Sequence, residues 1–293
     1  MKRLALAVAA AVVLAPAAAR AASPAATAPT QTARIGKQKI GYRSIGHGRP
    51  VVFVQGLAAT IDGWPPSFLD KVAAAGHRVV VFDNEGVGRS TLRAGTLSIR
   101  HMAQDTARLV KALRLKRPDV VGWSMGGMIA QSYAVRFPKQ LRKLVLLATA
   151  PGDGKAALPD AETLNLLTSG DPTMLLAELF PAEEINARDR YISDILQRFD
   201  FNGIARPAIV TAQLEASATW LIGGDPDGAK VGHIRAHALV GGGDQDRLLP
   251  VANQRHLAEL IPHAKLVTYS DAAHGFFFQH DADFAPRLTA FLR

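Results

Sequence analysis

Hydrophobic residues along the chain form continuous runs that alternate with segments of helical spacing. Continuous apolar runs are typical of strands that are buried on both faces of a sheet. The runs expected to form strands are residues 50–56, 77–83, 120–121, 143–148, 236–240 and 265–269, preceded by a short antiparallel hairpin over 34–46. Helical patterns occupy residues 68–75, 98–113, 125–137, 251–260 and 280–292. The alternation predicts an α/β fold, with a mainly parallel sheet covered by helices on both faces.

Residues 151–235 interrupt this alternation because they carry no strand signal. Their apolar residues cluster at helical spacing, and proline and glycine separate the clusters. The clusters are Leu164, Leu166 and Leu167; Leu175, Leu176, Leu179 and Phe180; and Ile192, Ile195 and Leu196. A structureless loop of this length is uncommon inside a domain. We therefore expect a helical cap over 151–235, inserted into a core formed by 35–150 and 236–293.

The amino-terminal segment has the pattern of a secretory signal peptide over residues 1–21. A basic start, Met1-Lys2-Arg3, precedes an apolar run, and Ala19-Arg20-Ala21 offers a small-residue cleavage site. The apolar run is too short to span a membrane. Residues 22–34 are rich in Ala, Pro and Thr, and we expect a flexible leader there. These features predict an exported protein, in the periplasm or outside the cell.

Composition narrows the possible classes of protein. Of the 293 residues, 48% are hydrophobic and 20% are charged, which is typical of a globular chain. There is no cysteine, so the fold has no disulfide and no thiolate metal site. The net charge of +9 falls to about +6 without Lys2, Arg3 and Arg20. The basic residues are scattered and lack interleaved aromatics, so no nucleic-acid partner is expected.

One short motif carries most of the chemical information. Gly122-Trp123-Ser124-Met125-Gly126 lies between an apolar run and a helical pattern. Strand, G-x-S-x-G, helix is the arrangement of a nucleophile elbow, in which a tight turn exposes the serine hydroxyl at a helix amino terminus. The motif alone is short enough to occur by chance, so partners elsewhere in the chain decide its meaning.

The motif and the order of strands resemble the α/β-hydrolase superfamily, and the resemblance covers about residues 37–292. Members of that family carry their triad in the order Ser, Asp or Glu, His. Residues 243–250 are similar to the family's acid loop, and 271–275 are similar to its histidine loop. The resemblance implies a triad of Ser124, Asp246 and His274.

Other residues of the sequence are candidates for the same roles. Asp244 is an alternative acid, although the family spacing favours Asp246. His280 begins a helix, and His263 precedes a strand and so falls at the opposite edge of the sheet. His233 and His237 have the i, i+4 spacing of a zinc helix, but no Glu follows His233 and His237 enters a strand. No metal site and no cofactor are therefore expected.

Two backbone amides are expected to form an oxyanion hole. One is the N–H of Met125, directly after the nucleophile, and the other is the N–H of Leu57, after the strand at 51–54. The family usually has His-Gly where this chain has Gln55-Gly56, which leaves the bracing of that loop open. Asp83 and Arg89 are expected to tie their own loop together.

The resemblance and the residue types together predict a serine hydrolase that cleaves carboxylic esters of an apolar small molecule. Lactonase and cofactor-free peroxidase chemistry use the same triad and stay open. An aminopeptidase-like activity is a further alternative, with Glu183 and Glu184 binding a substrate amine. The competing class is a non-catalytic small-molecule binder.

Overall fold

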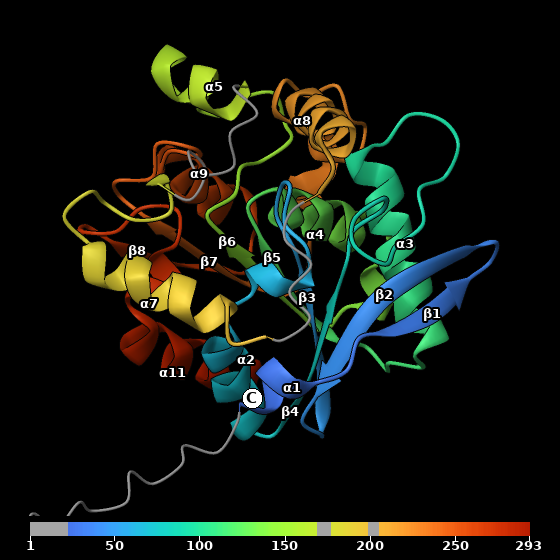
Figure 1. The fold of residues 1–293 in the computed structure, drawn as a ribbon. Helices are drawn as coiled ribbons and strands as arrows, with labels where there is room; N and C mark the ends of the chain where they lie inside the picture. Colours follow the sequence, from blue (N-terminus) through green and yellow to red (C-terminus); the bar gives the residue numbers. More distant parts are fainter. Residues whose placement is uncertain (1–22, 169–176, 199–204) are drawn as a thin grey trace, which may run out of the picture.

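The computed structural model describes residues 23–168, 177–198 and 205–293, and an eight-stranded sheet lies at its centre (Figure 1). The predicted signal peptide lies outside the described residues. The spatial order of the strands is β1-β2-β4-β3-β5-β6-β7-β8. In chain order they are β1 (Gln31–Ile35), β2 (Gln38–Ile45), β3 (Arg49–Val54), β4 (His77–Phe82), β5 (Asp119–Trp123), β6 (Lys143–Leu147), β7 (His237–Gly243) and β8 (Ala264–Tyr269).

The direction of the strands agrees with the predicted α/β class. β1, β2 and β4 pair antiparallel, and every other pairing in the sheet is parallel. All five residues of β5 are buried, as are the last four of β3 and of β6. This burial explains why these residues are apolar apart from Asp119, which pairs with Arg142, because helices cover both faces of the central strands.

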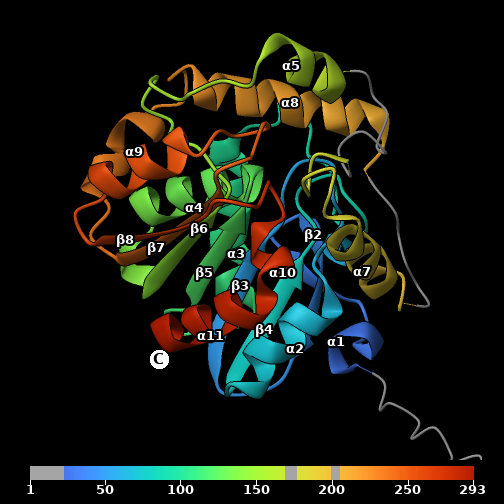
Figure 2. The same ribbon diagram turned by 90° about the vertical axis from the view of Figure 1, so that its left-hand side faces the viewer.

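Six helices of the core divide between the two faces of the sheet (Figure 2). Those packed on one face are α3 (Ile99–Ala112), α4 (Met125–Arg136) and α9 (Ala252–Leu260). Those packed on the other are α2 (Pro66–Ala74), α10 (Phe276–Gln279) and α11 (Asp281–Leu292). The sequence pattern missed α10, because its three consecutive phenylalanines are all buried and leave no helical period.

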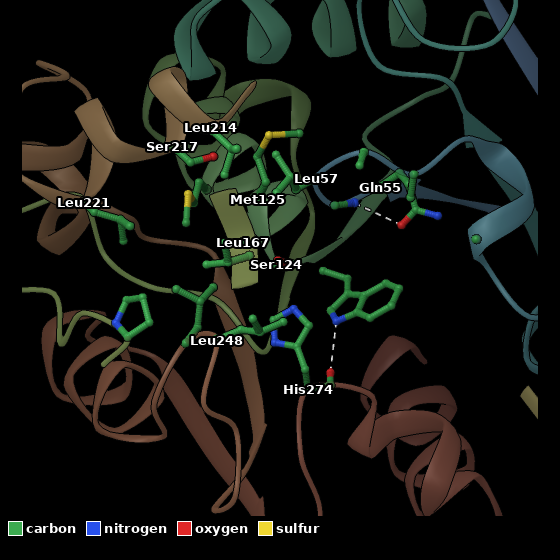
Figure 3. A pocket seen from close by; sticks show the side chains of 18 of the residues that line it. Gln55, Leu57, Ser124, Met125, Leu167, Leu214, Ser217, Leu221, Leu248 and His274 are labelled. Carbon is green, nitrogen blue, oxygen red and sulfur yellow. Dashed lines mark hydrogen bonds between the residues drawn. The ribbon is translucent and has the colours of Figure 1, made fainter. Parts of the chain in front are cut away.

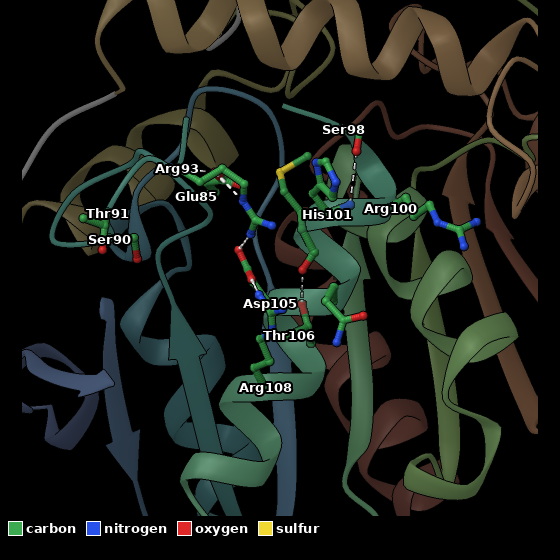
Figure 4. A network of polar contacts seen from close by, with 12 residues as sticks. Glu85, Ser90, Thr91, Arg93, Ser98, Arg100, His101, Asp105, Thr106 and Arg108 are labelled. Atoms are coloured by element: carbon green, nitrogen blue, oxygen red, sulfur yellow. Dashed lines mark hydrogen bonds and ion pairs between the residues drawn. The ribbon is translucent and has the colours of Figure 1, made fainter. Parts of the chain in front are cut away.

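A polar network ties the loop after β4 to α3 (Figure 4). Arg93 pairs with Glu85 at 2.8 Å and also with Asp105 of α3. Ser98 caps the amino terminus of α3 by accepting the N–H of His101 at 3.2 Å. The network holds the β4–α3 loop, whose Asn84 donates to the carbonyl oxygen of Gln55 at 2.8 Å.

The segment expected to be a flexible leader contains regular structure from residue 23 onward. A short helix, α1 (Pro24–Thr27), precedes β1, and the Ala25 N–H donates to Asp70 of α2 at 2.9 Å. Arg198, far along the chain, donates to the carbonyl oxygens of Ala25 and Ala28 at 2.6 and 3.0 Å. The expectation of flexibility was wrong there because these partners are remote and leave no local signal.

Between β6 and β7 the described residues form α5 (Ala161–Thr168), α7 (Ile185–Ile195), α8 (Pro207–Leu221) and a 3-10 turn, η3 (Gly228–His233). Leu175 and Leu176 of the predicted clusters lie outside the described residues. Figures 1 and 2 show α5 and α8 lying together on one side of the molecule. We refer to the described part of 151–235 as the cap. No helix within the described ranges has the length and apolar character needed to cross a bilayer.

Candidate active site

Ser124 occupies a strained turn between β5 and α4. Its backbone has φ 58° and ψ −126°, a conformation that residues other than glycine rarely adopt. The Ser124 N–H donates to the carbonyl oxygen of Leu147 at 2.9 Å, which fixes the turn to the neighbouring strand. Strain of this kind gathers at functional sites, because the surrounding structure must hold it.

The glycines of the motif are required by close packing. A Cβ on Gly122 would lie 2.3 Å from the carbonyl oxygen of Gly126. A Cβ on Gly126 would lie 2.1 Å from the carbonyl oxygen of Val54 in β3. Both distances are far below van der Waals contact, so α4 can approach the sheet this closely only with glycine at both positions.

Asp246 and His274 lie in the loops after β7 and β8, and the structure brings them together. Oδ2 of Asp246 is 2.8 Å from Nδ1 of His274, and both side chains are buried. Oδ1 of Asp246 accepts the Leu249 N–H at 2.9 Å. Because an ionised carboxylate only accepts hydrogen bonds, Nδ1 must carry the proton. The lone pair of the imidazole is therefore on Nε2.

Ser124 and His274 line one cavity of about 820 Å³ (Figure 3). Trp123, which precedes the serine, joins their loops: its Nε1–H donates to the carbonyl oxygen of His274 at 3.1 Å. The Trp123 and His274 rings lie 5.6 Å apart. The remaining wall is mainly apolar and comes largely from the cap and the acid loop, including Leu158, Leu164, Leu167, Leu214, Leu221 and Leu248. The site therefore suits an apolar ligand.

The two oxyanion-hole candidates, Leu57 and Met125, also line this cavity. Met125 is the first residue of α4, so its N–H has no acceptor within the helix and lies at the positive end of the helix dipole. Leu57 lies in the loop that leaves β3. An anion forming beside Ser124 would meet amide groups from both segments.

Gln55 braces the loop that carries Leu57. Its side chain is fully buried, with Oε1 accepting the Gly56 N–H and Nε2 donating to the carbonyl oxygen of Thr60, both at 3.0 Å. Asn84 donates to the Gln55 carbonyl oxygen at 2.8 Å. The side-chain amide of Gln55 thus links the two ends of the loop from Gly56 to Thr60.

The alternative residues lie in other surroundings. Asp244 is 3.5 Å from Arg255, and its side chain is about one third exposed. His280 Nε2 lies 3.0 Å from Asp271, and the ring centroids of His237 and His263 lie 5.3 Å apart with the rings tilted by 38°. In the described part of the chain, no group of three or more His, Asp or Glu side chains could hold a metal ion.

Asp83 plays a structural role in its loop. Its carboxylate accepts the Ile61 N–H at 2.8 Å and the Arg89 N–H at 3.0 Å. Burial raises the pKa of Asp83 to about 6, against the lowering effect of these two amides. Glu183 and Glu184 of the cap do not line the cavity.

Sequence reasoning missed the cap residues that reach the site. Gln213 of α8 is fully buried, and its Oε1 accepts the Ala58 N–H of the Leu57 loop at 2.8 Å. The Ala58 carbonyl oxygen accepts the Ala205 N–H at 2.7 Å. No motif marks these partners, because the two segments are about 150 residues apart in the chain.

The chain resembles proteins with several activities. A protein of Mycobacterium tuberculosis that is described provisionally as the non-heme bromoperoxidase BpoC is 29% identical over 256 residues, covering 83% of this chain and 94% of that protein. The 2-hydroxymuconate semialdehyde hydrolase of Pseudomonas sp. strain CF600 is 28% identical, with 84% and 88% covered.

Solved structures and a family profile agree on the fold. An alpha/beta hydrolase fold protein from Chitinophaga pinensis matches with a TM-score of 0.81 and 28% identity, covering 91% of this chain and 98% of that one. The profile of the alpha/beta hydrolase fold matches residues 49–201. The eight-stranded sheet, the serine at its tight turn and these matches show that the chain belongs to the α/β-hydrolase fold family.

Proposed function

We propose that the protein is a serine hydrolase that cleaves carboxylic esters of an apolar small molecule through an acyl-enzyme. One observation carries the proposal: Ser124 lines the same apolar cavity as His274, whose Nδ1 is held by the buried Asp246. A serine hydroxyl is a poor nucleophile at neutral pH, and an imidazole with a free Nε2 is the base that activates it.

The reaction follows from these positions. Ser124 Oγ attacks the ester carbonyl while His274 Nε2 takes its proton. The Met125 and Leu57 amides stabilise the oxyanion, and His274 then protonates the leaving alcohol. His274 next deprotonates a water, which attacks the acyl-serine, and then gives that proton to the leaving Ser124 Oγ as the acid is released. Asp246 holds the imidazole in orientation and stabilises its positive charge during both steps.

One similar structure supports lactone hydrolysis as an alternative reaction of the proposed triad. A solved structure titled as an N-acyl homoserine lactone degrading enzyme is 26% identical, with a TM-score of 0.70 and 89% of this chain covered. In a lactone the ester is cyclic, so the same steps open the ring. The first experiment should therefore offer p-nitrophenyl esters of two to twelve carbons beside lactones of similar size.

Stopped-flow measurement of p-nitrophenol release is the decisive assay. We expect a burst equal to the enzyme concentration, and no burst from Ser124→Ala. A covalent fluorophosphonate adduct should form on Ser124 and be found by mass spectrometry. If the purified protein neither turns over any member of the panel nor forms the adduct, it is a binder and the proposal is wrong.

We further propose that the protein is exported, on the basis of its basic, apolar and small-residue amino terminus. Amino-terminal sequencing of protein from a periplasmic or culture fraction should find a chain that begins at Ala22. A chain recovered only from the cytoplasm, with Met1 retained or only Met1 removed, would argue against export.

A further inference from the structure

The loop from Gln55 to Thr60 is held by two groups of partners of different origin. The first group belongs to the core: the side chain of Gln55 itself, and Asn84 from the loop after β4. The second belongs to the cap: Gln213 of α8 and the backbone of Ala205, which precedes α8. The cap therefore touches the loop that carries one proposed oxyanion donor.

The peptide planes of the loop show what each partner fixes. A peptide plane is rigid, so holding its C=O or its N–H sets its orientation. The plane joining Gln55 to Gly56 is held at both its C=O and its N–H: Asn84 donates to the carbonyl oxygen, and Gln55 Oε1 accepts the amide N–H. The plane joining Leu57 to Ala58 is held by Gln213. Between them lies the plane that contains the Leu57 N–H, so its direction depends on both neighbours.

Ala58 gives the cap contact a specific task. Its φ is 61°, in the left-handed region that alanine disfavours because of its Cβ. The residue is buried, and both its N–H and its C=O are bound by the cap, at 2.8 and 2.7 Å. Without these bonds the residue could relax to an ordinary conformation, which would turn the preceding peptide planes.

Gln213 is poorly explained by stability alone. Its side chain is fully buried, and its Nε2 has no hydrogen-bond partner among the described residues. A buried polar atom without a partner is destabilising, and native proteins contain few of them. Its Oε1, in contrast, accepts the Ala58 N–H, and this hydrogen bond is the reason we give for an amide at this position.

On the basis of the proposed ester hydrolysis, we propose that Gln213 is a positioning residue, through which docking of α8 aims the Leu57 N–H into the active-site cavity. The cap then does more than shape the substrate pocket. Displacement of α8 removes one oxyanion donor while leaving Ser124, His274 and Asp246 in place.

The test compares variants that differ in one acceptor atom. Gln213→Leu removes the acceptor, Gln213→Asn withdraws it by one methylene, and Gln213→Glu keeps an oxygen at the position that faces Ala58. Asn253→Leu is the matched control, because this buried amide of α9 also joins the cap to the core, by accepting the N–H and donating to the C=O of Ala157, both at 2.8 Å. That contact lies outside the Leu57 loop.

Kinetics should separate positioning from general loosening. For Gln213→Leu and Gln213→Asn we expect kcat to fall about 10- to 100-fold, somewhat less than the loss of an oxyanion donor. KM should stay within about three-fold, and affinity for a trifluoromethyl ketone, whose adduct places an alkoxide in the hole, should fall in parallel with kcat. The pH profile should not move, because the His274 pair is untouched, and Gln213→Glu should recover most of the rate.

Hydrogen exchange tests whether Gln213 holds the loop of residues 55–60, an interaction that we call the clamp, and it does not depend on turnover. Peptides that cover residues 55–60 should exchange faster in Gln213→Leu and Gln213→Asn than in the wild type or in Asn253→Leu. Unchanged exchange at 55–60, or an equal loss of kcat in Asn253→Leu, would overturn the inference. An inactive wild type would contradict the proposed ester hydrolysis, whereas the exchange comparison would still decide the clamp.

Discussion

Replacing Asp246 by asparagine tests the geometry of the site most directly, because the two carboxylate oxygens have separate tasks. Oδ1 accepts the Leu249 N–H at 2.9 Å, and Oδ2 accepts the Nδ1–H of His274 at 2.8 Å. An asparagine has one oxygen and one NH₂ group. The backbone N–H of Leu249 can only donate, so the oxygen turns to it and the NH₂ faces His274.

The NH₂ group then requires Nδ1 to accept, which moves the imidazole proton to Nε2. In that tautomer His274 cannot take the Ser124 proton. In serine proteases this change lowers kcat about 10⁴-fold, and we expect a loss of that size here. It corresponds to about 5 kcal/mol of transition-state stabilisation.

The assay is steady-state hydrolysis of the best p-nitrophenyl ester, with circular dichroism to confirm folding. Asp244→Asn is the matched control, since Asp244 is in the same loop but faces Arg255 at 3.5 Å. It should keep kcat within about two-fold. A kcat for Asp246→Asn within ten-fold of the wild type would refute the assignment of Asp246, and a large loss in Asp244→Asn would point to the rival acid.

Two further predictions concern stability. Burial raises the pKa of Asp83 to about 6 from an ordinary 3.8, so the folded state retains a proton that the unfolded state releases. The free energy of unfolding should therefore fall by about 2 kcal/mol as pH rises from about 4 to 6, measured by urea titration, and Asp83→Asn should flatten this dependence. Trp220 of α8 is fully buried and donates to the Ala150 carbonyl oxygen at 3.2 Å. Trp220→Ala should lower the free energy of unfolding by about 3–5 kcal/mol in the same titration. A loss below about 1 kcal/mol would contradict this prediction and show that α8 packs loosely against the core.

The sheet and its helices could be predicted because their signals are local. β3, β5 and β6 are apolar along their buried residues, apart from Asp119 at the start of β5, since both faces of the sheet are covered. The turn at Ser124 requires glycine at 122 and 126 because a Cβ there would collide with backbone oxygens. The motif can therefore be recognised from the sequence alone.

The cap helix α8 left no comparable signal, although residues 151–235 were expected to be helical. Its Ile209 and Trp220 are buried in the protein, whereas Leu214 and Leu221 line the cavity. Apolar residues on two sides of one helix blur the stripe from which amphipathic helices are recognised. The contact between Gln213, in the middle of α8, and the Ala58 N–H therefore could not be predicted from the sequence.

The same property of α8 links substrate choice to rate. Leu214 and Leu221 shape the cavity, while Gln213, on the same helix, binds the loop of Leu57. A substitution that shifts α8 to admit a different substrate would also shift the acceptor that holds Ala58. Under the proposed clamp, changes of cavity shape made through α8 should alter kcat as well as KM, whereas changes made through α5, at Leu164 or Leu167, should act mainly on KM. The cap would then divide into one helix that tunes binding and another that tunes binding and catalysis together.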